Sequence, residues 1–405
     1  MSGQGSVFGG SLLIAGSCIG AGMLGLPVIT GISGFFPSLI MFFVAWAFMT
    51  TTGLLLVEVN QWFDSDINLA SMVGRTLGAA ARVVTQVLYL FLFYALLTAY
   101  IAGSGHHLSN IFSRLVPVTV GSLFFVLLFG NFVYMGTRAV DLFNRLLMVG
   151  KIGAFLGLVA LGVKYVNIDM LMHHEWKYSF FPIAVLVVSF GFHNMVPTLN
   201  HYMGGDTKRV RASIIGGSVL ALVIYLIWII ICVGIIPVEG KHGLLEAYHE
   251  GIDAAQLLRN FVTSRSVGIL ALLLALFAIL TSFLAQSLSL VHFLSDCFDN
   301  RGENRESMGM LCLALLPPLI LAILYPNIFF AALCFAGGIC AVILFGLFPA
   351  MMVWRGRYEQ NMEANYRVLG GKGVLSIVIA FSLIVFITQV CTLFGYSLFP
   401  IPAGT

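Results

Sequence analysis

Ala15-Gly16-Ser17-Cys18-Ile19-Gly20-Ala21-Gly22-Met23-Leu24-Gly25-Leu26-Pro27 interrupts the first long apolar segment of the chain. Each of its four glycines disfavours a helix by about 1 kcal/mol relative to alanine, and its proline disfavours a helix more strongly. Non-helical backbone at membrane depth is tolerated only where protein or a water-filled cavity surrounds it. We therefore expect this stretch to be the unwound centre of a broken helix.

The composition of the chain is that of a membrane protein. Of its 405 residues, 60% are hydrophobic and 9% are charged. Apolar runs of 18 or more residues recur along the chain, which indicates a polytopic all-α membrane protein. The first apolar run is long and lacks preceding Lys or Arg, so we expect no cleaved signal peptide. A net charge of +3, without a long basic run, gives no reason to expect a nucleic-acid partner.

The apolar segments predict eleven transmembrane helices, since about 20 residues cross the hydrocarbon core. The connections between them are too short for a separate soluble domain, so residues 1–405 form one transmembrane domain. The predicted spans are 7–31, 34–60, 83–107, 117–135, 142–166, 180–200, 211–236, 267–294, 308–326, 328–353 and 374–396.

The basic residues of the connections predict the orientation. With the N-terminus in the cytoplasm, the cytoplasmic connections, counting Lys151 near the start of the fifth span, hold fourteen Lys and Arg residues and the outer connections hold six. Cytoplasmic connections of membrane proteins carry the excess of Lys and Arg. Eleven spans then place the C-terminus on the periplasmic side.

A second interrupted segment follows in the sixth predicted span, at Ser189-Phe190-Gly191-Phe192-His193-Asn194-Met195-Val196-Pro197. It repeats the pattern of the first break, with glycine and polar residues at mid-span and a proline after them. Spans one to five and six to ten then form two halves, residues 7–166 and 180–353, followed by an extra helix at 374–396. An odd number of spans per half inverts one half relative to the other, and paired interrupted helices indicate a transporter site at the membrane midplane.

The two breaks predict a binding site for a zwitterion. The restarting half-helix offers free amides for a carboxylate, and the half-helix that ends offers free carbonyls for an ammonium group. The candidate substrate-binding residues of the breaks are Ile19, Gly20, Ala21, Gly22, Met23, Phe190, Gly191, Phe192, His193 and Asn194. The alternative interpretation of Gly16-xxx-Gly20 is close helix packing through small residues.

Other polar residues in the apolar spans are candidates for substrate contact or ion coupling. Tyr100 and Ser104 in the third span could cover the substrate site, and His193 could bind substrate or gate by protonation. Lys151 in the fifth span could switch its charge when buried, or it could extend toward the membrane interface. Thr281 and Ser282 in the eighth span could line a cation site, or they could bond to the preceding turn of their own helix.

The histidine pairs do not predict a metal site. His106-His107 and His173-His174 lie at the ends of segments, where we expect them to be solvated, and they lack metal-ligand spacing. The chain also shows no nucleophile with a neighbouring base. We therefore expect neither an enzyme nor a bound metal or cofactor.

Several of these motifs together resemble the hydroxy and aromatic amino acid permeases, a family that includes the bacterial tyrosine- and tryptophan-specific permeases. The resemblance runs nearly end to end along the chain. The motifs that carry it are Gly20-Ala-Gly-Met-Leu, Leu54-Leu-Leu-Val-Glu58-Val, Tyr94-Ala-Leu-Leu-Thr-Ala-Tyr100-Ile, Val140-Asp-Leu-Phe-Asn-Arg145, Ser189-Phe-Gly-Phe-His193 and Thr281-Ser282-Phe283. In sodium-coupled relatives a Thr-Ser pair in the eighth helix holds the ion, and in some proton-coupled relatives a lysine of the fifth helix takes its place. The chain has both features.

The resemblance implies the LeuT-type fold of two inverted five-helix repeats and a proton symporter in the bacterial inner membrane. The implied substrates are aromatic amino acids, tyrosine first and then tryptophan and phenylalanine. Besides the substrate and the lipid bilayer, we expect no obligate protein partner. Asn194 and Met195 stand where smaller residues are expected. Sodium coupling and a broader neutral or hydroxy amino acid specificity remain alternatives, and an ion channel is an alternative of a different class.

Overall fold

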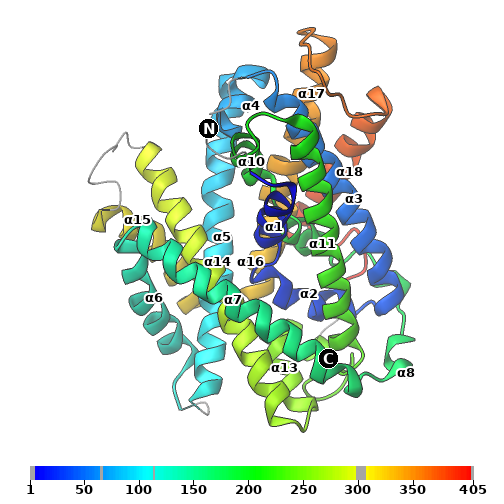
Figure 1. The fold of residues 1–405 in the computed structure, drawn as a ribbon. Coiled ribbons are helices and arrows are strands. Elements are labelled where there is room, and N and C mark those ends of the chain that lie inside the picture. The colour runs from blue at the N-terminus through cyan, green and yellow to red at the C-terminus, as the bar shows by residue number, and fades with distance from the viewer. Residues whose placement is uncertain (1–4, 64–66, 113–114, 298–306, 403–405) are drawn as a thin grey trace.

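The computed structural model describes residues 5–63, 67–112, 115–297 and 307–402. These residues form a bundle of helices in which every predicted span is helical (Figure 1). The spans are, in order, α1 (Val7–Cys18) with α2 (Gly22–Gly31), α3 (Phe35–Asn60), α5 (Ala79–Ile111), α6 (Val118–Tyr134), α7 (Thr137–Gly162), α9 (Ile183–Ser189) with α10 (Val196–Tyr202), α11 (Thr207–Val233), α14 (Arg265–Cys297), α15 (Met308–Leu324), α16 (Phe329–Phe335) with η4 (Ala336–Leu347) and α17 (Phe348–Tyr358), and α18 (Gly371–Leu393).

Length and composition support this assignment of the spans. Within the described ranges, eight helices are long and apolar enough to cross a membrane, and the bent pair α1–α2 adds a ninth. The other two spans, α6 and α15, are apolar helices of 17 residues each, at the lower end of the range that crosses a bilayer.

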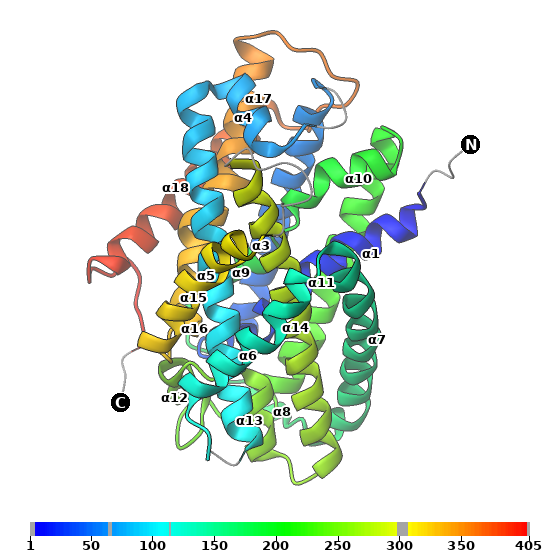
Figure 2. The same cartoon turned by 90° about the vertical axis from the view of Figure 1, so that its left-hand side faces the viewer.

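Short helices lie in the connections, at the two ends of the bundle. Figure 2 shows α4 (Leu69–Leu77), α10 and α17 at one end, which we call the α4 face. The opposite end, the α13 face, carries α8 (Ile168–Leu171), α12 (Leu244–Glu250) and α13 (Ala254–Phe261). In the same view α1 extends sideways from the bundle at mid-height.

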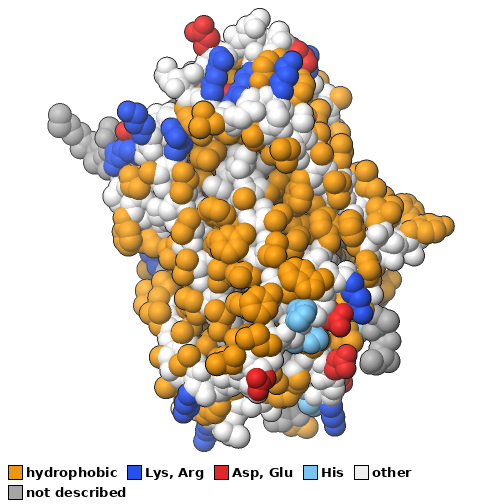
Figure 3. All heavy atoms as spheres, turned by 90° about the vertical axis from the view of Figure 1, so that its right-hand side faces the viewer, with side chains coloured by type: hydrophobic (Ala, Val, Ile, Leu, Met, Phe, Trp, Pro, Cys, Tyr) orange, Lys and Arg blue, Asp and Glu red, His pale blue; other side chains and the backbone are white. Residues whose placement is uncertain are grey.

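The surface between the two faces is apolar. Figure 3 shows hydrophobic side chains over the middle of the molecule and charged side chains gathered toward its two ends. This is the distribution that a bilayer selects, because charges are costly in the hydrocarbon core. Three of the basic residues used to predict the orientation, Arg114, Arg301 and Arg305, lie outside the described residues.

A buried ion pair joins α3 of the first half to α17 of the second. The Nε of Arg357 donates to Glu58 at 2.6 Å, and the Val368 amide donates to the same carboxylate at 2.9 Å. The side chains of Glu58 and Arg357 are 0% and 6% exposed. This ion pair ties the two halves of the chain together at the α4 face.

Candidate functional site

The first break lies in the middle of the bundle, where α1 and α2 meet at an angle of 61°. The Ala21 amide donates to the Ser282 hydroxyl of α14 at 2.9 Å. A Cβ on Gly20 would lie 2.6 Å from the same hydroxyl oxygen, so this approach requires glycine. The Gly22 amide, at the start of α2, forms no hydrogen bond within the described residues. It is therefore the one amide of residues 20–22 that remains available to a carboxylate, since the Gly20 amide donates to Cys18.

The second break faces the first. After α9 ends at Ser189, the chain passes through Gly191 and one turn, η3 (His193–Met195), before α10 begins. The Tyr225 hydroxyl of α11 lies 2.6 Å from the Cys18 carbonyl oxygen and 2.8 Å from the Ser189 carbonyl oxygen. Tyr225 is fully buried, so one side chain holds the ends of α1 and α9 together.

A cavity of about 70 Å³ lies between the two breaks. Six of the candidate residues line this cavity, and they come from the first break, α5, α14 and the second break. They are Gly20, Gly22, Tyr100, Gly191, Asn194 and Ser282. Its other lining residues are Ser17, Cys18, Tyr89, Leu92, Phe93, Leu96, Val188, Ser189, Gln286, Leu333 and Phe345. The two breaks and the α5 and α14 side chains thus surround one space.

The backbone groups of the first break form hydrogen bonds at Ile19, Ala21 and Met23. The Ile19 carbonyl accepts from Lys151, and the Met23 carbonyl accepts from the Trp228 indole at 3.0 Å. Ser104 does not line the cavity. Its hydroxyl donates to the Ile101 carbonyl of its own helix at 2.7 Å. These contacts fix the shape of the break.

The aromatic residues of the second break point away from the cavity. Phe190 packs against Phe42 and Tyr225 with ring-centroid distances of 6.4 and 5.2 Å. Phe192 stacks on His193 at 4.9 Å and approaches α3 closely at Gly53. Neither of these two candidate substrate-binding residues lines the cavity.

His193 also lies outside the cavity. Its Nε2 is 2.8 Å from the Thr52 hydroxyl of α3, and its ring stacks on Phe345 at 5.0 Å. Its Nδ1 is buried and has no partner within the described residues. The ring therefore packs against Phe345, a residue that lines the cavity.

Lys151 enters the first break from α7. Its Nζ donates to the Ile19 carbonyl at 2.7 Å and lies 3.5 Å from the Thr281 hydroxyl. The residue is 4% exposed, so its side chain is buried in the bundle and does not extend to the interface. The Thr281 hydroxyl also bonds to the Ala278 carbonyl at 3.1 Å, as the alternative interpretation of this pair expected.

Apart from Tyr100, the wall on α5 was missed by the sequence interpretation, although its spacing is regular. Tyr89, Leu92, Phe93, Leu96 and Tyr100 recur at helical spacing and line one side of the cavity. A stripe of this kind defines one face of a helix. The signal was available in the sequence, but nothing in it marked this face of α5 as the one turned toward the breaks.

Two missed polar residues complete the lining. The Ser189 hydroxyl is buried without a partner within the described residues, and it lies 3.0 Å from where a Gly22 Cβ would stand. Gln286 lies four residues after Ser282 on α14, which puts the two on the same face of the helix. Both could have been found from their spacing to residues already singled out.

A wider cavity of about 480 Å³ connects this site to the α4 face. It is lined by residues of α4, α10 and α14, and it shares Tyr89, Phe93 and Asn194 with the cavity between the breaks. Those three side chains form the neck between the two spaces. The site is thus approached from the α4 face.

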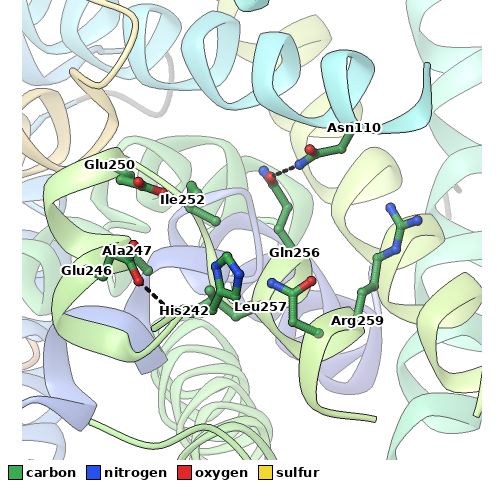
Figure 4. A pocket seen from close by; sticks show the side chains of 10 residues that line it. Asn110, His242, Glu246, Ala247, Glu250, Ile252, Gln256, Leu257 and Arg259 are labelled. Atoms are coloured by element: carbon green, nitrogen blue, oxygen red, sulfur yellow. Dashed lines mark hydrogen bonds between the residues drawn. The ribbon is translucent and has the colours of Figure 1, made fainter. Parts of the chain in front are cut away.

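The α13 face has a polar hollow of its own, separate from the breaks (Figure 4). At its edge the Asn110 amide of α5 donates to Gln256 of α13 at 2.6 Å. Close by, His107 of α5 lies 2.6 Å from Asp253, with both side chains 1% exposed. The expectation that His107 is solvated is therefore wrong, because α13 covers it.

The surroundings of the buried Asp253 carboxylate favour its charged form. Burial raises its pKa, but the neighbouring His107 ring and the hydrogen bonds from His107 and Gln256 together outweigh burial and lower the pKa below its ordinary value. The Ala255 amide also donates to it at 2.9 Å. Among the described residues no group of three or more His, Cys, Asp or Glu could hold a metal ion.

Two broken helices around a shared cavity at the centre of a membrane-spanning bundle define the fold class of the protein, which is the LeuT-type transporter fold. The solved structure of MhsT in complex with L-phenylalanine matches this fold with a TM-score of 0.63, covering 94% of this chain and 98% of that one at 13% identity.

Sequence comparison places the chain within this class. It belongs to the tryptophan/tyrosine permease family, whose model matches residues 4–389. The tyrosine-specific transport system 2 of Haemophilus influenzae is 31% identical and covers 98% of both chains. The tryptophan-specific transport protein of the same organism is 30% identical, over 96% of this chain and 97% of that protein. The chain is therefore a multi-pass membrane permease and not an enzyme.

Proposed function

We propose that the protein is a proton-driven symporter that imports aromatic amino acids, with tyrosine as the first candidate substrate and tryptophan and phenylalanine next. The single observation that carries this proposal is the cavity between the breaks, which places unpartnered polar groups beside an apolar wall. The Gly22 amide and the Ser189 hydroxyl are unpartnered polar groups there, and they suit the zwitterionic end of an amino acid.

The apolar wall suits the ring. One side of the cavity is lined by Leu92, Phe93 and Leu96 of α5, and Phe345 of η4 also lines the cavity. Pockets for small molecules usually span about 300–1,000 Å³, which exceeds the 70 Å³ of this cavity. Binding an aromatic amino acid therefore requires Tyr89 and Phe93 to turn at the neck, so that the ring gains part of the wider cavity.

Lys151 supports proton coupling. Its ammonium group donates to the Ile19 carbonyl of the first break and faces the Thr281 hydroxyl. A sodium ion bound at this position would need these same two oxygens as ligands. A charged ammonium group repels sodium from these oxygens, and proton loss would free them. Release of the Ile19 carbonyl on deprotonation would couple proton movement to the conformation of the break.

We propose that the protein lies in the bacterial inner membrane with the α4 face toward the cytoplasm. The structure then has its substrate path open to the cytoplasm, and α12 and α13 cover the periplasmic side. Alternating access would move the broken helices relative to α5, α7 and α14.

Uptake of radiolabelled tyrosine into proteoliposomes tests the proposal. An imposed inward proton gradient should drive accumulation without sodium, and unlabelled tyrosine should compete better than serine. A requirement for sodium would reject proton coupling. Competition by serine equal to that by tyrosine would favour a broad neutral carrier, and absence of uptake of every aromatic amino acid would reject the proposed substrate class.

A further inference from the structure

Gln286 is a polar side chain that the transport mechanism described above does not use. It lines the cavity from α14, is partly exposed, and forms no hydrogen bond within the described residues. The neighbouring Ser282 hydroxyl is occupied by the Ala21 amide. The Gln286 amide is therefore free to bind whatever enters the cavity.

Gln286 lies at a different height along the axis of α14 from the backbone groups of the two breaks. Ser282 marks the level of the first break. Gln286 lies four residues further along α14, a rise of about 6 Å, in the direction of Phe293, which lines the wider cavity. An amino acid docked with its charged groups at the breaks would carry its side chain past this amide.

The surroundings of Gln286 on the opposite wall are apolar. Leu92, Phe93 and Leu96 present hydrocarbon at the neighbouring turns of α5, and Val188 and Leu333 also line the cavity. The other lining amide, Asn194, is exposed and belongs to the neck shared with the wider cavity. The Tyr89 hydroxyl of α5 also belongs to that neck. On α14, at the turn beyond Ser282, the Gln286 amide is the polar group that faces the cavity.

We propose that Gln286 determines specificity within the aromatic class by accepting a hydrogen bond from a donor on the substrate ring, the phenol O–H of tyrosine or the indole N–H of tryptophan. Phenylalanine has no such donor and would leave the amide oxygen without a partner inside the closed site. A site that hydrogen-bonds a substrate group discriminates against the analogue that lacks it. This inference rests on the proposed function, because it assumes that the cavity binds aromatic amino acids.

Inhibition of labelled tyrosine uptake in proteoliposomes by unlabelled tyrosine, tryptophan and phenylalanine tests the inference. Gln286→Met keeps the length of the side chain and removes the acceptor. We expect it to lower the preference for tyrosine over phenylalanine about tenfold, the effect of one neutral hydrogen bond, and to lower the preference for tryptophan similarly. The inhibition constant of phenylalanine should stay the same or fall, because the variant has no amide oxygen to leave without a partner, and its inhibition also shows that the variant is folded.

Ser287→Ala is the matched control, because Ser287 is the adjacent polar residue of α14 and does not line the cavity. Its preference for tyrosine should equal that of the wild type. If Gln286→Met is inactive, Gln286→Leu is measured in its place. Wild-type preferences retained in the Gln286 variants would overturn the inference while leaving the proposed function intact, whereas wild-type protein without aromatic uptake would reject the proposed function itself.

Discussion

The contact between Gly20 and Ser282 makes the first break sensitive to a single methyl group. In Gly20→Ala the new Cβ would stand 2.6 Å from the Ser282 hydroxyl oxygen, a separation that carbon and oxygen do not tolerate without movement. Ser282 must then turn away, and the Ala21 amide loses the acceptor that lies 2.9 Å from it. The methyl group would also project toward the cavity that Gly20 lines.

The expected size of this effect follows from the lost hydrogen bond. A buried donor left without its acceptor costs about 1–3 kcal/mol. If the form of the break that binds substrate carries this cost, the affinity for substrate falls by a factor of about 5 to 150. Equilibrium binding of tritiated tyrosine to the purified protein measures it without any contribution from the driving ion.

Gly16→Ala is the matched control on the same helix. The nearest atom to its new Cβ would be the terminal methyl of Met148, at 3.4 Å, a flexible group that can adjust. This variant should bind like the wild type, since alanine also favours the helical backbone of α1. Equal affinity of the Gly20→Ala and Gly16→Ala variants, with both proteins folded, would refute the role assigned to the first break.

Three further predictions concern coupling and stability. Lys151→Met should abolish accumulation of substrate against a gradient while counterflow exchange persists, because only the coupling group is lost; concentrative uptake at neutral pH like that of the wild type would reject its role. Arg357→Met leaves Glu58 charged and buried, which should destabilise the protein by about 3–5 kcal/mol in thermal unfolding; Glu58→Gln combined with Arg357→Met should recover part of the loss, and additive losses would contradict the pairing. Asp253→Asn removes a carboxylate whose pKa is lowered by folding, so its contribution is present above its ordinary pKa of 3.8 and lost as the pH falls through the lower folded value. The difference in melting temperature from the wild type should persist at neutral pH and shrink only in strongly acidic buffer, and a difference that vanishes at neutral pH would argue against a charged Asp253.

The breaks were predictable because glycine and proline act on the local backbone. Gly20 and Gly191 each stand where a continuous helix is unfavourable, and their equivalent positions in the two halves predicted a shared site. The structure brings both into one cavity. The number and order of the spans were predictable for a similar reason, since the hydrocarbon thickness sets the length of every apolar segment.

Side-chain directions within the second break were not predictable. A helix fixes direction by its period, but the chain between α9 and α10 has no such period. Phe190 and His193 therefore turn toward α11 and α3 and not into the cavity. The tie made by Tyr225 between the two breaks depends on the packing of α11 against α1, which no local pattern shows. The burial of His107 likewise depends on α13, a helix distant in sequence.

The central claim is that the cavity between the two breaks holds the substrate, and Cys18 tests it directly. Of the seven cysteines in the chain, Cys18 is the one that lines this cavity. In a variant that retains only Cys18, the rate of alkylation by a small thiol reagent is measured with and without tyrosine. Saturating tyrosine should slow the reaction at least severalfold, with serine giving little protection at the same concentration. A rate that is unchanged by every aromatic amino acid would contradict the claim.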